Sequence, residues 1–355
     1  MPVVNRLVDR LMRKQALAGS GIRKNEAPLL SVQANNIGGQ YGRFVIPCER
    51  HTYHFNPSVM DHAGRRWLVS RKFWMDYQTP WDYLSKMAAR EIMEDMTLGE
   101  ERLISPKLRD PRESIEDPRC SVAFGKQCIG AVSWITPNKE QIQGMQKGRG
   151  KPKIVIHQSL FQLGNGLDVE KIVDVEYGGN GPSIFYGTGA EKNWLWFDHD
   201  GKTYFIYRAE PHVVVEVEDG KVVQEHITGT ALGWTVGEIR GGTPPVRVGD
   251  HFLTFFHSSM PWKKTPRYGV RNVYFMGAYL FEAKPPFKIV ASTRERLLTG
   301  TWNEPIQEGV PAVVYPNGAL LDGNQWLITL GVNDCGCGWV KIDHSEIENR
   351  LSSCR

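Results

Sequence analysis

A hairpin pattern recurs five times along this 355-residue chain and constrains its fold more than any other feature. Each occurrence has a polar or proline-containing opening motif, an apolar strand, a glycine turn and a second apolar strand with a polar end. The turn glycines are Gly64, Gly125, Gly201, Gly249 and Gly323, and separations of 61, 76, 48 and 74 residues leave room for four-stranded sheets. The pattern predicts an all-β fold, a five-bladed β-propeller whose polar strand ends meet in one axial funnel. A β-sandwich or a two-domain all-β protein is the alternative, since glycine-centred hairpins occur in every antiparallel fold.

The composition fits a folded, turn-rich protein, with 36 glycines, 21 prolines and 41% hydrophobic residues. A formal net charge of +4 is mild for this length and does not by itself indicate a polyanionic partner. The six cysteines form no CxxC pair, so we expect reduced thiols and no metal site. No stretch approaches the ~20 apolar residues of a membrane span, and the start lacks a signal-peptide core. We therefore expect a cytoplasmic protein.

Two segments favour helices. Residues 3–17 gather apolar side chains on one helical face, which predicts an N-terminal helix and extension over residues 1–40, ahead of a propeller catalytic domain over residues 41–355. This helix would dock on the main body or join two subunits of a homo-oligomer, with membrane-surface binding less favoured. A second helix is predicted over residues 79–97, opened by a Thr-Pro cap signal. The basic KGRGKPK stretch is interpreted as a solvated loop.

The first group of candidate chemical residues is Glu116-Asp117-Pro118-Arg119. Two adjacent carboxylates precede a proline that fixes the backbone and an arginine that can pair with one of them. A carboxyl group held in a turn at the start of a strand is placed for proton transfer. The alternative is an ordinary surface turn with an ion pair.

The second group contains Lys192, Asn193 and Arg208, with Glu210 just beyond. Arg208 ends an apolar strand, and a charge in such a setting needs a partner. That partner would be either an anionic ligand or a protein carboxylate, with Glu210 the nearest along the chain.

Two further groups lie in the later hairpins. Thr243 belongs to a GGTPP turn, and the following strand delivers His257, which a satisfied core histidine would explain equally well. Asn317 and Asp334 lie at the two ends of the last hairpin, where glycines permit a ligand to approach and are equally typical of tight turns. No phosphate-binding P-loop, GxSxG or HExxH motif competes with these groups. Carboxylates, cations and hydroxyl-binding groups are the residues that glycosyl transfer uses.

Taken in order, the motifs resemble a known family. EDPR, the EKNW block, the GGTPP block, GAYLFEAKPPFKI and VVYPNGALLDGNQWLITLGVND follow one another within about residues 55–343. This ordered set resembles the β-mannoside phosphorylases and hydrolases of glycoside hydrolase family 130 and the related mannosyltransferases that share their propeller. The resemblance implies that Asp117 is the catalytic acid and that Lys192, Arg208 and His257 bind phosphate. Lys192 stands where the family more usually has an arginine. Lysine keeps the positive charge but cannot form the two parallel hydrogen bonds that a guanidinium offers to phosphate.

The function expected from these observations is inverting glycosyl transfer to or from a phosphate group, phosphorylase-like, on a β-mannoside or similar sugar. Inorganic phosphate or a sugar nucleotide would be the co-substrate, with no cofactor or metal. Asp117 and Glu116 would act in catalysis, and the remaining candidates divide into an anion-binding set (Lys192, Asn193, Arg208, His257) and a sugar-binding set (Arg71, Arg119, Glu210, Thr243, Asn317, Asp334).

Two alternatives stay open at this stage. One is a glycosyltransferase that carries an activated sugar to an unusual acceptor; a nucleic acid is conceivable there but not favoured, because a basic loop of this length is more often merely solvated. The other is a non-catalytic carbohydrate-binding propeller in which the 11 tryptophans offer stacking surfaces for sugars.

Overall fold

The computed structural model describes residues 32–34, 38–47, 52–74, 84–107, 110–135, 140, 156–175, 177, 193–229, 231–265, 269–300, 312–334 and 336–354. These residues form antiparallel β-sheets, and the one helix with described bounds is the short α3 (His344–Glu348). Within these ranges no helix has the length and apolar character that crossing a membrane requires.

Four sheets have four strands each, in an order that runs from an inner to an outer strand. The first contains β3 (Thr52–His62), β4 (Arg65–Trp74), β5 (Leu84–Glu91) and β6 (Arg102–Ile104). The second contains β7 (Glu113–Ala123), β8 (Lys126–Ile135), β9 (Ile156–Leu163) and β10 (Val169–Asp174). The third contains β11 (Leu195–His199), β12 (Lys202–Arg208), β13 (His212–Glu218) and β14 (Lys221–Thr228). The last contains β21 (Val314–Asp322), β22 (Gln325–Val332), β23 (Gly336–Asp343) and β2 (Gln40–Arg43), so a strand from early in the chain completes it.

The remaining sheet has eight strands built around the long pair β17 (His251–Thr265) and β18 (Gly269–Glu282). Two short strands, β15 (Arg240–Gly241) and β16 (Val246–Val248), pair with β17 on its inner side. On the outer side, β19 (Ile289–Thr293) and β20 (Leu298–Gly300) pair with β18. β24 (Leu351–Ser353) adds to β19, and β1 (Val32–Ala34) adds to β20. Four regular sheets are one fewer than the five equal blades predicted, because the fourth hairpin lies in this larger sheet.

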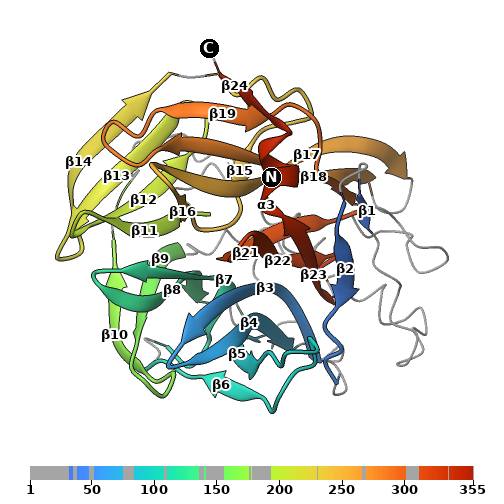
Figure 1. The fold of residues 1–355 in the computed structure, drawn as a ribbon. Helices are drawn as coiled ribbons and strands as arrows, with labels where there is room; N and C mark the ends of the chain where they lie inside the picture. Colours follow the sequence, from blue (N-terminus) through green and yellow to red (C-terminus); the bar gives the residue numbers. More distant parts are fainter. Residues whose placement is uncertain are drawn as a thin grey trace.

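The five sheets are arranged radially, as Figure 1 shows. Contacts run from β3 to β7, from β7 to β11, from β12 to β15, from β17 to β21 and from β21 back to β3. Each sheet packs against a neighbour on both of its faces and buries apolar residues on both. Because the sheets close into a ring, none of the five described sheets is left with an uncovered face. The prediction of an all-β, propeller-like fold is confirmed.

Five apolar clusters fill the five spaces between neighbouring sheets. Val69 and Phe161 belong to the cluster between the first and second sheets, and Val59 and Leu327 to the cluster that joins the first sheet to the last. The other three clusters lie between the second and third sheets, between the third and the eight-stranded sheet, and between that sheet and the last. Burial of this apolar surface, at about 25 cal/mol per Å², holds the ring closed.

The helix predicted over residues 79–97 is wrong, because β5 occupies residues 84–91 of that segment. β5 pairs with β4 and β6, so the neighbouring strands satisfy its backbone. Met87 and Ala89 are buried against the second sheet. Tertiary pairing thus overrides the helix preference of Ala, Met and Glu in this segment.

The predicted helix at residues 3–17 and the KGRGKPK stretch lie outside the described residues. The boundary proposed between residues 40 and 41 stays a prediction. β1 precedes that boundary and pairs with β20, so part of the predicted extension joins the eight-stranded sheet.

Candidate functional site

The inner strands are interrupted at their opening motifs by β-bulges. The register shifts between Phe55 and Ser58 in β3, between Glu116 and Arg119 in β7, and between Pro316 and Gly318 in β21. A bulge bends its strand and re-aims one side chain, and bulges are frequent next to active sites. At two of them a polar residue adopts the left-handed backbone region, Asn56 with φ 50° and Asp117 with φ 54°. Asn and Asp tolerate this conformation better than other residues with a side chain.

The bulge residues of three inner strands contact one another. The side-chain amide Nδ2 of Asn56 donates a 2.7 Å hydrogen bond to Oδ1 of Asp117. Nδ2 of Asn317 donates to the backbone carbonyls of Asn56, at 2.8 Å, and of Pro118. The first, second and last sheets are thereby joined at the axis, and Asp117 is only 5% exposed.

Arg71 supplies the positive charge beside the two carboxylates. It lies on β4, is 2% exposed, and its Nη2 bonds the carboxylate of Glu116. Its Nη1 lies 3.5 Å from Oδ1 of Asp117, and its Nε donates to the hydroxyl of Ser85 at 2.7 Å. A buried arginine with two carboxylates fixes the position of both, since neither charge can be left alone without a large desolvation cost.

Arg119 organises a second network on the same inner strand. Its guanidinium donates to Oδ1 of Asn193 at 2.9 Å and to the hydroxyl of Tyr315, which itself donates to Asn193 Oδ1 at 3.0 Å. Asn193, with φ 65°, lies two residues before β11 of the third sheet, and Tyr315 lies on β21 of the last sheet. The polar ends of distant hairpins therefore meet at one place.

His257 lies on β17 beside this network, with its ring centroid 4.5 Å from that of Tyr315. Burial, and then the charges of Arg240 and Arg119, hold the pKa of His257 well below its usual value. The uncharged form of His257, a hydrogen-bonding group, is therefore favoured. Its Nδ1 has no hydrogen-bond partner among the described residues, and the strand register places Arg240 directly opposite.

The structure assigns other surroundings to several predicted residues. Thr243 is fully buried, and its hydroxyl accepts from the backbone N–H of Phe255 at 3.1 Å, so it holds the turn before β16. Asp334 lies half-buried in the turn between β22 and β23 with φ 53°. Glu210 is exposed and accepts from the N–H of Leu232 at 3.3 Å. Within the described parts of the chain, none of these three side chains bonds to the Asp117 or Arg119 networks.

Two members of the predicted anion site are less defined. Arg208 ends β12 and is half-buried, and the described residues include no ion pair between it and Glu210. Lys192 lies outside the described residues. No group of three His, Cys, Asp or Glu side chains in the described ranges could hold a metal ion.

Sequence reasoning missed Asn56, Tyr315 and Arg240. Asn56 stands in an Asn-Pro pair that matches the Asp117-Pro118 pair of the next sheet, so comparison of the opening motifs could have found it. Tyr315 and Arg240 adjoin the predicted PNG and GGTPP motifs, and no local pattern separates them from core or surface residues.

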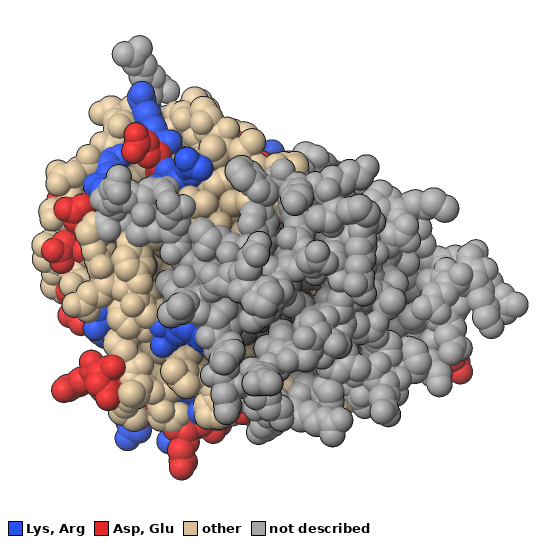
Figure 2. All heavy atoms as spheres, turned by 90° about the vertical axis from the view of Figure 1, so that its right-hand side faces the viewer, with Lys and Arg blue, Asp and Glu red and all other residues tan. Residues whose placement is uncertain are grey.

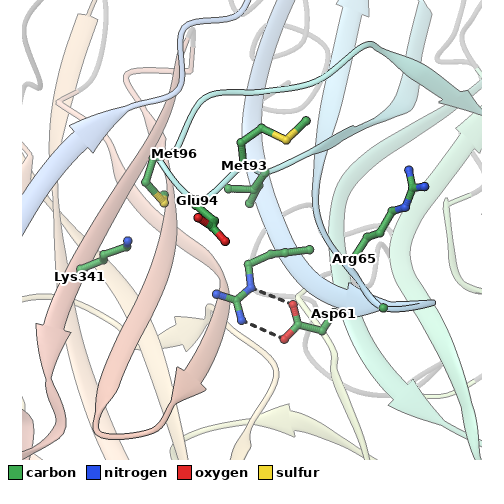
Figure 3. A pocket seen from close by; sticks show the side chains of 9 residues that line it. Asp61, Arg65, Met93, Glu94, Met96 and Lys341 are labelled. Atoms are coloured by element: carbon green, nitrogen blue, oxygen red, sulfur yellow. Dashed lines mark hydrogen bonds and ion pairs between the residues drawn. The ribbon is translucent and has the colours of Figure 1, made fainter.

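An open groove of about 470 Å³ lies at the rim between the first and last sheets and shares no residue with this axial site. Figure 3 shows its lining side chains, among them Met93, Met96 and Lys341. The guanidinium of Arg66 bonds both carboxylate oxygens of Asp61, at 2.8 and 3.0 Å. On the described part of the face in Figure 2, acidic and basic residues are interspersed. At the rim, Arg66 thus pairs with both Asp61 and Asp322.

Comparison with known proteins identifies the fold. No protein-family model matches the sequence, and no curated protein matches it. Among solved structures, a β-1,2-mannobiose phosphorylase from Listeria innocua, in complex with β-1,2-mannobiose, is 16% identical, with 86% of this chain and 95% of that chain covered and a TM-score of 0.57. The chain has the fold of the mannoside phosphorylases.

Two further structures agree with this fold assignment. A mannose phosphorylase from Leishmania mexicana, in complex with a phosphate ion, is 10% identical over 96% of this chain and 95% of that chain, with a TM-score of 0.57. A structure described with the GH130 family of mannoside phosphorylases, which contains glycoside hydrolases targeting β-1,2 mannosidic linkages, is 12% identical over 89% and 97%, also with a TM-score of 0.57. The fold thus agrees with the family resemblance that the ordered sequence motifs indicated.

Proposed function

We propose that this protein is an inverting glycoside phosphorylase that acts on a β-mannoside or a similar sugar, with Asp117 as general acid. One observation carries the proposal. A buried carboxylate stands on a left-handed bulge of an inner strand, held by Asn56 of the next inner strand and faced by Arg71. The fold shared with mannoside phosphorylases supports the same reading.

Of the two adjacent carboxylates, Asp117 suits proton transfer better. Glu116 is tied to Arg71 by a direct ion pair, whereas the nearest Arg71 nitrogen lies 3.5 Å from Asp117. Glu116 thus neutralises Arg71 and fixes its position. Asp117 stands at the bulge, a position that changes the direction of a side chain.

The reaction breaks the bond between the anomeric carbon and the leaving oxygen while a phosphate oxygen attacks that carbon from the opposite face. The proton of Asp117 moves to the leaving oxygen, which departs as an alcohol. A β-glycoside then gives an α-sugar 1-phosphate, because a single displacement inverts the anomeric centre. General acid catalysis of this kind is worth ~10² to 10⁴ in rate.

Phosphate would bind beside His257 and Arg240. The two residues are opposite each other on β17 and β15, and neutral His257 offers a hydrogen bond where Arg240 offers charge. Asn193 lies next to this pair through Tyr315. Arg208 and Lys192 remain proposed members of the anion site.

We also propose that the eight-stranded sheet is the fifth blade of a five-bladed propeller. Its strands keep the order of a blade, with the inner strand divided into β15 and β16 and the outer one into β19 and β20. β1 and β24 are additions from the two ends of the chain. Five apolar clusters between five sheets support this count.

The test is incubation of the purified protein with β-mannosides, with and without inorganic phosphate, followed by assay for sugar 1-phosphate. We expect release only when phosphate is present, and a phosphate-dependent rise in melting temperature, since ligand binding to the folded state stabilises it. Consumption of a sugar nucleotide instead would identify a glycosyltransferase. Phosphate-independent release of free sugar would identify a hydrolase, and saturable sugar binding without turnover a binding protein.

A further inference from the structure

We infer that Arg119 is the positioning residue of Asp117: its guanidinium, bonded to residues of three other sheets on or beside their inner strands, holds the Asp117 bulge in place. This inference rests on the proposed function, since it assigns Arg119 to the geometry of the general acid. It replaces the expectation that Arg119 contacts the sugar.

The hydrogen bonds of Arg119 begin at the bulge itself. Its Nη1 donates to the backbone carbonyl of Asp117 at 3.2 Å, and its Nε donates to the carbonyl of Gly242 at 2.9 Å. Gly242 belongs to the interruption between β15 and β16 in the eight-stranded sheet. The Asp117 peptide, which has an unfavourable φ of 54°, is therefore tied across the axis to another sheet.

The other end of the guanidinium reaches two more sheets. Nη2 bonds Oδ1 of Asn193 and the hydroxyl of Tyr315, and the guanidinium carbon lies 5.5 Å from the centre of the Tyr315 ring. Four of the five N–H groups of an arginine are thus used by protein acceptors. At most one N–H group is therefore left for a ligand, and the residue is only 2% exposed. Both observations support a positioning role.

Only a planar fork can make this set of bonds. A lysine at position 119 keeps the charge but is a point donor, which cannot reach Gly242, Asn193 and Tyr315 at once. The bulge would then relax, and a displacement of about 1 Å in a catalytic group costs about 100-fold in rate. The loss should fall on the step that needs the proton.

Leaving-group dependence separates positioning from general structural damage. An alcohol leaving group needs protonation, whereas a dinitrophenolate departs without it. With glycosides of the sugar found in the phosphorolysis screen, we expect Arg119→Lys to lower kcat about 100-fold for the disaccharide and less than about threefold for the dinitrophenyl glycoside, with KM little changed. Equal losses on both substrates, or no loss on either, would overturn the inference.

Three companion variants make the result unambiguous. Asp117→Asn is measured on the same two substrates, the disaccharide and the dinitrophenyl glycoside. If its losses do not depend on the leaving group, the proposed function fails. If the losses depend on the leaving group in Asp117→Asn but not in Arg119→Lys, only the role of Arg119 fails. Tyr315→Phe removes one acceptor of Arg119 and should give the same dependence at a few-fold size, which serves if Arg119→Lys does not fold. Arg66→Lys, at the rim groove, is the matched control and should leave both rates unchanged.

Discussion

The amide of Asn56 donates a 2.7 Å hydrogen bond to the carboxylate of Asp117, although 61 residues separate them in the chain. Both residues stand on bulges of neighbouring inner strands, and both are about 5% exposed or less. The bond joins the first and second sheets at the axis and sets the orientation of the proposed acid.

Replacing Asp117 by Asn should remove most activity while the fold is kept. The amide oxygen still accepts from Asn56, but the side chain has no proton to deliver, so kcat for an unactivated glycoside should fall ~10² to 10⁴. Steady-state kinetics and circular dichroism check this. Asp110→Asn is the control, because Asp110 bonds Arg112 in a surface turn. Wild-type turnover by Asp117→Asn would move the acid role to another carboxylate.

Glu116→Gln should destabilise the protein by about 3 kcal/mol, because it removes one charge of a buried ion pair. Arg71 would remain 2% exposed with only the more distant Asp117 as a countercharge. Urea denaturation measures the free energy of unfolding. The matched control is Glu170→Gln, which breaks an exposed ion pair with Lys126 and should cost about 0.5 kcal/mol or less. Similar losses in both variants would contradict the importance of burial here.

Stability should decline as the pH falls from about 6.5 to about 4, in part because of His212. Burial lowers the pKa of His212 to about 4, against an opposing effect of its bond with the carbonyl of Phe287. The unfolded chain takes up the proton first, so acid favours unfolding by at most about 3 kcal/mol from this residue. His212→Asn should flatten the pH dependence of the unfolding free energy. An unchanged slope would show that other groups cause it.

Removing residues 351–355 should lower the melting temperature by a few degrees. β24 pairs with β19, and the N–H of Cys354 bonds the carbonyl of Val290 at 2.9 Å. This strand follows β23 and α3, so it ties the last sheet to the eight-stranded sheet. Differential scanning calorimetry measures the shift, with Cys354→Ser as a control that keeps the strand. A melting temperature equal to wild type would mean that the ring closes without this strand.

The sequence by itself determined the local units of this protein. Alternating apolar residues around Gly64, Gly125, Gly201, Gly249 and Gly323 specify hairpins, because side-chain periodicity and turn conformation depend on residues close in the chain. The Glu116-Asp117-Pro118-Arg119 motif nominated two adjacent carboxylates, and the family resemblance of the ordered motifs singled out Asp117 as the proposed acid. Within the described residues, local preference misled in β5, where it was weaker than tertiary pairing.

Only the tertiary structure decided which of these units meet. Asn317 bonds Asn56 across 261 residues, and Arg119 bonds Tyr315 across 196, so neither contact leaves a local pattern. Closure of the ring also places β2 beside β23 and divides the inner strand of the eight-stranded sheet. The same closure buries His257 next to Arg119 and Arg240, which lowers its pKa. Burial and long-range pairing, which depend on the whole ring, therefore set the chemistry of residues that the sequence could only nominate.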